Sequence, residues 1–116
     1  MALSYFALAF VTNKSGEKRK ALEYYESAIG INVHLSPRNP RTSDAYFDAA
    51  NVAMDLGDHQ KALHYFTESL KIKELVYGPS SDENKKVYLG LYSLYVLMGD
   101  METANRYKTL SSAQTV

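Results

Sequence analysis

The sequence predicts an all-α solenoid of three antiparallel helix pairs, and the prediction rests on two observations. Glycines at positions 16, 57 and 99 are separated by 41 and 42 residues, and alanines and tyrosines repeat with the same steps: Ala21, Ala62, Ala104; Tyr5, Tyr46, Tyr88; Tyr24, Tyr65, Tyr107. A fixed period of about 20 to 50 residues is typical of a repeat array. Apolar residues inside each unit also recur at helical spacing.

Each unit contains two such helical patterns. In the second unit, Tyr46, Ala49 and Ala53 fall on one helix face, and Leu63 and Phe66 begin another after the glycine. We therefore expect six helices and no strand, with limits at about 2–14, 18–34, 42–56, 59–77, 83–98 and 101–113. They form one domain over residues 1–116, with repeats at about 2–36, 42–78 and 83–113.

The two helices of a pair are joined by short turns with clear signals. Gly57 and Gly99 suit the left-handed conformation that follows a helix end. Asp58 and Asp100 come directly after them and can cap the next helix by accepting a free backbone N–H. The prolines lie between the units, in 36–44 and 77–83, where they separate one pair from the next.

Charge and composition exclude several classes of partner. Thirteen Lys and Arg balance thirteen Asp and Glu, so we expect no nucleic-acid partner. The apolar opening, "MALSYFALAFV", is too short to cross a bilayer, so we expect no membrane insertion. The chain has no cysteine, which suits a reducing compartment, and we expect a cytoplasmic protein, with the nucleus as the alternative.

The sequence offers no catalytic or metal-binding constellation. His59 and His64 are five residues apart, which does not align them on one helix face, and no nucleophile, base and orienting group occur in a recognisable pattern. A helix-end charge and an N-cap explain Asp55 and Asp58. We therefore expect no enzyme activity, no metal and no cofactor.

The repeated positions resemble the tetratricopeptide repeat family. Its order of aromatic, Leu-small pair, Gly, Ala, aromatic and Ala is matched in the first two units by Tyr5, Leu8, Ala9, Gly16, Ala21, Tyr25, Ala28 and by Tyr46, Ala49, Ala50, Gly57, Ala62, Phe66, Ser69. The period exceeds the roughly 34 residues usual in that family. The long linkers resemble those of the kinesin-light-chain type. The resemblance implies a right-handed superhelix.

The family resemblance also implies a function and a site. The first helix of each pair lines a concave, mostly apolar groove that binds a peptide or a partner helix, so the protein is expected to be an adaptor or scaffold. The groove residues are then Phe6, Phe10, Asn13, Phe47, Asn51, Met54, Leu89 and Ser93. Phe6, Phe10, Phe47 and Leu89 would act as anchors, while Asn13 and Asn51 would bond the backbone of the ligand.

A structural role is the alternative. The aromatic row of Phe6, Phe10 and Phe47 could pack against a neighbouring repeat and leave no free groove. Solenoids need polar capping units, and neither end of this sequence has an obvious one. On this hypothesis the chain is a segment of a longer array, or it associates with other copies of itself through its terminal helices.

Overall fold

The computed structural model describes residues 8–9, 11–35, 39–78 and 81–113, and these are helical apart from short turns. Residues 8–9 and 11–14 are helical, and five further helices follow: α2 (Lys18–Leu35), α3 (Pro40–Asp55), α4 (His59–Tyr77), α5 (Asn84–Leu97) and α6 (Met101–Ala113). No strand occurs in these ranges. The predicted all-α fold is confirmed.

The helix expected to begin at residue 42 begins two residues earlier, at Pro40. The Asn39 side chain accepts a hydrogen bond from the backbone N of Arg41 at 2.9 Å and so caps the helix. Proline is well suited to the first helical position, because its ring fixes φ and its missing N–H would have no partner within the helix. From the sequence, this proline was expected in the linker that precedes the helix.

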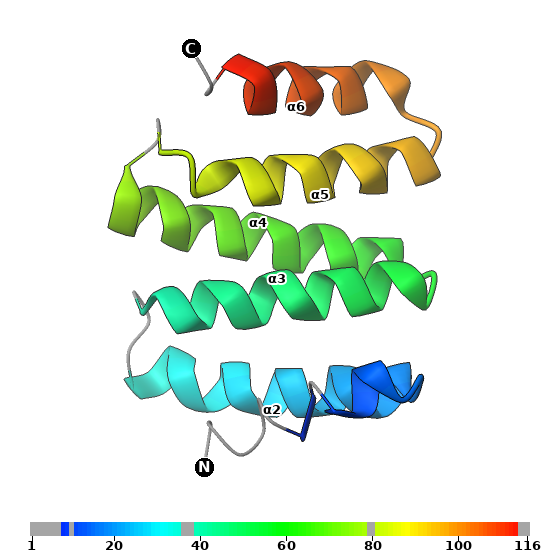
Figure 1. The fold of residues 1–116 in the computed structure, drawn as a ribbon, viewed down its shortest axis with the longest axis vertical. Helices are drawn as coiled ribbons and strands as arrows, with labels where there is room; N and C mark the ends of the chain where they lie inside the picture. Colours follow the sequence, from blue (N-terminus) through cyan, green and yellow to red (C-terminus); the bar gives the residue numbers. More distant parts are fainter. Residues whose placement is uncertain (1–7, 10, 36–38, 79–80, 114–116) are drawn as a thin grey trace.

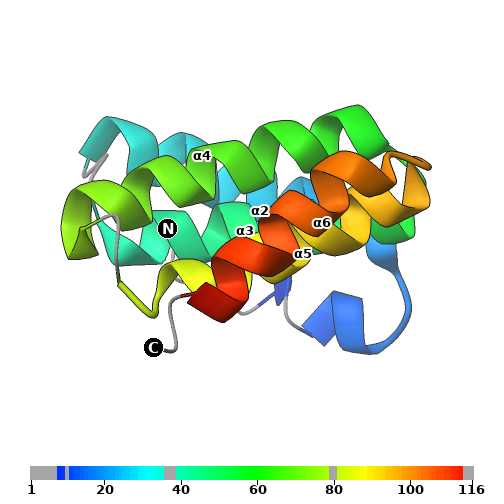
Figure 2. The ribbon, with the colours of Figure 1, turned by 90° about the horizontal axis from the view of Figure 1, so that it is seen from above.

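The helices stack in chain order along the long axis of the molecule (Figure 1). The helices α3 and α4 pack together, as do α5 and α6, while α2 packs on α3 and α4 packs on α5. Seen along the stack, α4 lies on one side and α3 and α5 lie on the other (Figure 2). The predicted α-solenoid is confirmed, and it places the first helices of successive pairs next to each other.

The turns within the pairs repeat one backbone pattern. Gly57 and Gly99 have φ angles of 84° and 82°, so their predicted left-handed conformation is confirmed. In the second pair, Gly57 N donates to Met54 O and Asp58 N donates to Ala53 O. The Asp58 carboxylate then accepts from Lys61 N, and Asp100 accepts from Thr103 N, each at 3.2 Å. Both predicted caps are confirmed.

Small side chains allow the helices to approach closely. Ala21, Ala62 and Ala104, the repeated alanines, are all fully buried. Between α3 and α4 the core also holds Phe66, the largest fully buried side chain in the described part of the chain. Both α3 and α5 bury one face in this core and leave other residues half-buried or exposed.

Candidate peptide-binding groove

The outward-facing residues of α5 form one row. Val87, Leu91 and Leu94 are buried, and their spacing of four and three residues fixes the core face of the helix. Other residues of this helix are exposed, among them Lys86, Leu89, Ser93 and Val96. Leu89 has an exposed fraction of 51%, which is high for a leucine in the middle of a helix. The predicted groove residues Leu89 and Ser93 therefore lie on an accessible face.

A second row lies on α3. Ala45, Ala49 and Ala53 are buried against the neighbouring helices. The row on the other side is formed by Asp44, Phe47, Asp48, Asn51, Met54 and Asp55, which are half-buried or exposed. Among the predicted groove residues, Met54 packs partly against the core. We call the α3 row and the α5 row together the α3/α5 face.

A cation–π contact joins the two rows. Lys86 Nζ of α5 lies 5.6 Å from the centroid of the Phe47 ring on α3. The same ring meets Phe66 of α4 edge to face, with the centroids 5.8 Å apart. Phe47 is thus half-buried, with one part of the ring in the core and the Lys86 ammonium above it.

The two predicted asparagines are engaged in local contacts. Asn51 Nδ2 donates to the backbone oxygen of Phe47, one turn earlier in α3, at 3.2 Å. Asn13 Oδ1 accepts from Lys18 Nζ at 3.2 Å, and the same ammonium pairs with Asp55 at 3.1 Å. Lys18 therefore connects the helical residues 11–14 to α3. Phe6 and Phe10, the two remaining predicted anchors, lie outside the described residues.

The α3 row is more acidic than the mostly apolar groove expected from the sequence. Asp44, Asp48 and Asp55 all lie on it, and Asp44 and Asp48 were not among the groove residues expected from the sequence. Burial, together with the nearby Asp44 carboxylate, raises the pKa of Asp48 to about 6, although Lys86 partly opposes the shift. The spacing of four and seven residues between these aspartates was the signal in the sequence that places them on one helix face.

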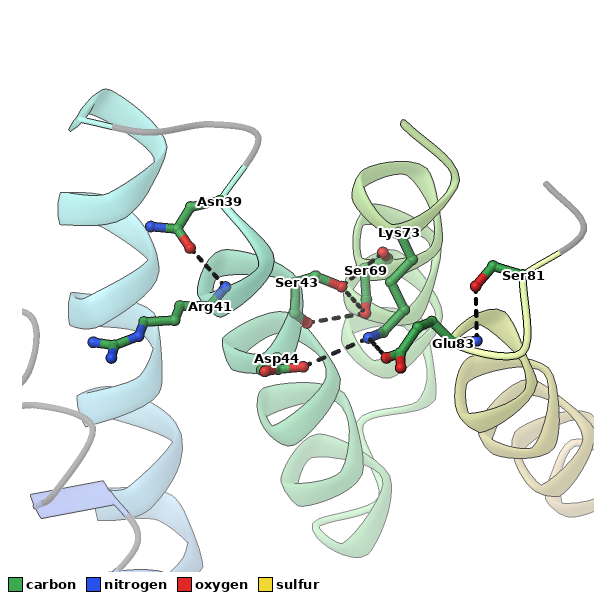
Figure 3. A network of polar contacts seen from close by, with 8 residues as sticks. All are labelled: Asn39, Arg41, Ser43, Asp44, Ser69, Lys73, Ser81 and Glu83. Carbon is green, nitrogen blue, oxygen red and sulfur yellow. Dashed lines mark hydrogen bonds and ion pairs between the residues drawn. The ribbon is translucent and has the colours of Figure 1, made fainter. Parts of the chain in front are cut away.

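A buried lysine holds the acidic end of this row in place (Figure 3). The Lys73 side chain of α4 is only 4% exposed, and its Nζ lies 3.6 Å from Asp44 of α3 and 3.5 Å from Glu83, directly before α5. Beside it, the hydroxyl groups of Ser43 and Ser69 are 2.9 Å apart and fully buried. One ammonium thus links three consecutive helices.

Neither a metal site nor a membrane span is found in the described part of the chain. No group of three or more His, Asp or Glu side chains there could hold a metal ion. His64 is exposed on α4 and contacts the ring of Tyr65. None of the helices described is long and apolar enough to cross a membrane.

The stacked helix pairs and their accessible α3/α5 face define a helical repeat protein of the α-solenoid class. A tetratricopeptide repeat family model matches residues 37–112, and a second tetratricopeptide repeat model matches residues 2–32. The first match covers more than half of the chain, so the protein belongs to the tetratricopeptide repeat family. Members of such helical repeat families generally bind other proteins through the extended surfaces that the repeats create.

Solved structures of other proteins share this fold. BtubC (BKLC) from P. vanneervenii superposes with a TM-score of 0.93 at 24% sequence identity, over 97% of this chain and 45% of that one. The TPR domain of Arabidopsis FLU gives a TM-score of 0.85 at 18% identity, over 98% of this chain and 93% of that one. This chain thus spans less than half of BtubC. No match is found among curated proteins.

Proposed function

We propose that the protein is an adaptor or scaffold module that binds a peptide or a partner helix along the α3/α5 face. The observation that carries the proposal is the exposed row on α5, in which Leu89 is 51% exposed and lies one turn from Ser93. Exposed apolar side chains on such a face can anchor a ligand, since a few residues provide most of the binding energy of an interface.

Phe47, in the α3 row, supports the same proposal. Its ring is half-buried and contacts both Lys86 and the core residue Phe66. A ligand that displaced the Lys86 side chain would reach an aromatic surface already fixed in position by the core. Because little conformational entropy is lost by a side chain that is already held, such an anchor favours affinity.

The proposal is tested best at Leu89, because truncation of Phe47 would also damage the core. A partner is first recovered by affinity purification with the unaltered chain. We expect Leu89→Glu to reduce the recovery of that partner at least about tenfold, as a loss of 1.4 kcal/mol or more implies. Leu75→Glu is the matched control, since Leu75 is 64% exposed but lies on α4. Equal recovery with both variants would contradict the groove assignment.

Self-association is the second candidate function, and the C-terminal helix pair favours it. Leu97, Met98, Met101 and Leu110, on α5, α6 and the turn between them, are 38–59% exposed. A second copy that covered these side chains would remove apolar surface from water. We would measure the mass by light scattering over a concentration series. A mass that rises with concentration, and falls to that of a monomer in Met101→Glu/Leu110→Glu, would favour this role.

A further inference from the structure

We propose that the α3/α5 face takes a basic amphipathic peptide, with Lys or Arg side chains along α3 and apolar side chains along α5. This inference rests on the proposed function and specifies the chemistry of the partner. It follows from a difference between the two rows that form the face: the α3 row carries three aspartates, and the α5 row carries the exposed apolar residues Leu89 and Val96.

The acidic row consists of Asp44, Asp48 and Asp55. They are four and seven residues apart, so they follow one face of α3. The Asp44 side chain is 61% exposed and that of Asp55 is 51% exposed, although each has a lysine partner. Such half-exposed carboxylates can accept a further cation from a ligand without losing the contacts that they already make.

Three carboxyl groups lie at the end of the row near Asp44, together with the ammonium groups of Lys73 and Lys86. Lys73 is the buried ammonium there, and it faces two carboxylates, those of Asp44 and Glu83. Asp48 adds a third, partly desolvated carboxyl group, and burial together with Asp44 raises its pKa. A cationic side chain laid along this end would relieve the repulsion between these groups.

Lys86 shows how an ammonium can be accommodated on this face. Its Nζ lies over the Phe47 ring, and its charge lowers the pKa of Asp48. An aromatic face next to a carboxylate is a favourable environment for a cation. Lys86 therefore occupies the position that a basic side chain of the peptide would take, and the two would compete for it.

The α5 row complements this arrangement with apolar surface. Leu89 and Val96 are 51% and 37% exposed and lie two turns apart, with Ser93 between them. A peptide with one basic and one apolar side would satisfy both rows. An acidic peptide would be repelled by the carboxylates of α3. A wholly apolar peptide would take the exposed parts of these carboxylates out of water without adding a polar contact, which is costly.

The experiment uses two fluorescein-labelled peptides of about 14 residues, or four helical turns. They share one pattern of leucines and differ in carrying either Lys or Glu at all remaining positions. Binding to the full chain is measured by fluorescence anisotropy. We expect the Lys peptide to bind at least about tenfold more tightly than the Glu peptide, and its affinity to fall as salt is raised from about 50 to 200 mM.

Variants locate the effect on the α3 row. Asp44→Asn/Asp48→Asn should weaken binding of the Lys peptide at least about tenfold. Glu23→Gln/Glu102→Gln removes the same charge from exposed residues of α2 and α6, and it should change the affinity by less than about twofold. Lys86→Gln should strengthen binding, because it removes the competing ammonium. Circular dichroism confirms that each variant is folded.

The outcomes separate this inference from the proposed function. Equal affinity for the two peptides, or equal losses in the two double variants, would overturn the charge preference and leave the groove assignment standing. Failure of both peptides to bind would overturn the basic-peptide inference as well. The proposed function is then decided independently by the recovery of the cellular partner with Leu89→Glu and Leu75→Glu.

Discussion

The junction between α2 and α3 and the junction between α4 and α5 fill equivalent positions with different side chains. Tyr25 and Phe66 are 41 residues apart and both are buried, on α2 and α4 respectively. Their counterparts on the following helices, Asp48 and Gly90, are 42 residues apart. The first junction therefore combines a phenol with a carboxyl group, and the second combines a phenyl ring with a residue that has no side chain.

The residue pairs at the two junctions, Tyr25 with Asp48 and Phe66 with Gly90, impose different constraints on packing and on charge. A Cβ atom at Gly90 would lie 2.5 Å from the Phe66 ring, so the packing of α4 on α5 requires glycine there. At the other junction, burial and the carboxylate of Asp48 raise the pKa of Tyr25 to about 12. One backbone register thus accommodates a sterically tight junction and an electrostatically sensitive one, and each can be altered separately.

Removal of the Phe66 ring should have the largest effect. Phe66 is fully buried and contacts α3 through Phe47 and α5 at Gly90. Phe66→Ala would leave a cavity between three helices, and we expect the free energy of unfolding to fall by about 3–5 kcal/mol. Urea denaturation followed by circular dichroism measures the loss. A decrease below about 1 kcal/mol would mean that α5 closes onto the cavity.

A side chain at Gly90 should destabilise the same junction by overpacking. We expect Gly90→Ala to lower the free energy of unfolding by about 1–3 kcal/mol, because the Phe66 ring is enclosed and cannot move aside. Gly30→Ala is the control. Gly30 is an exposed residue within α2 and a Cβ there would have no neighbour within 4 Å, so alanine should stabilise the chain by about 0.5–1 kcal/mol. Equal effects in the two variants would contradict the tight packing at Gly90.

Asp48 should make the first junction sensitive to pH. Its pKa is about 6 in the folded protein and 3.8 as the ordinary value, so between pH 4 and 6 the folded state binds more protons than the unfolded state. Stability contributed by this group should therefore fall as the pH rises through this window. Asp48→Asn should remove that dependence and raise the free energy of unfolding at pH 7 by about 1–2 kcal/mol. Urea denaturation at pH 4.5 and pH 7 measures both changes, and an unchanged slope in the variant would contradict the assignment to Asp48.

The sequence predicted what repeats and missed what differs between repeats. The period of glycines, alanines and tyrosines was sufficient for the helix pairs, for the turns at Gly57 and Gly99 and for the caps at Asp58 and Asp100, because each depends on contacts within a few residues. The contacts of Lys73 with Asp44 and Glu83 connect residues 29 and 10 positions apart in the chain, and no local pattern specifies them. The acidic α3 row was readable from its spacing, but the partial burial of Asp48 depends on how α2 and α5 pack around it.

The turn after α3 and the turn after α5 offer a further comparison, because the same substitution should have the same effect on stability in both. Gly57 and Gly99 share their φ angle within 2°, and a Cβ atom at either would have no neighbour within 4 Å. The only free-energy cost of alanine at either position would therefore be that of holding a residue with a Cβ in the left-handed conformation, about 1 kcal/mol. We expect Gly57→Ala and Gly99→Ala to lower the free energy of unfolding equally, within about 0.5 kcal/mol. A clearly larger loss at Gly57 would show that the central turn also supports the packing of α2 on α3, where Lys18 reaches Asp55 just before the turn.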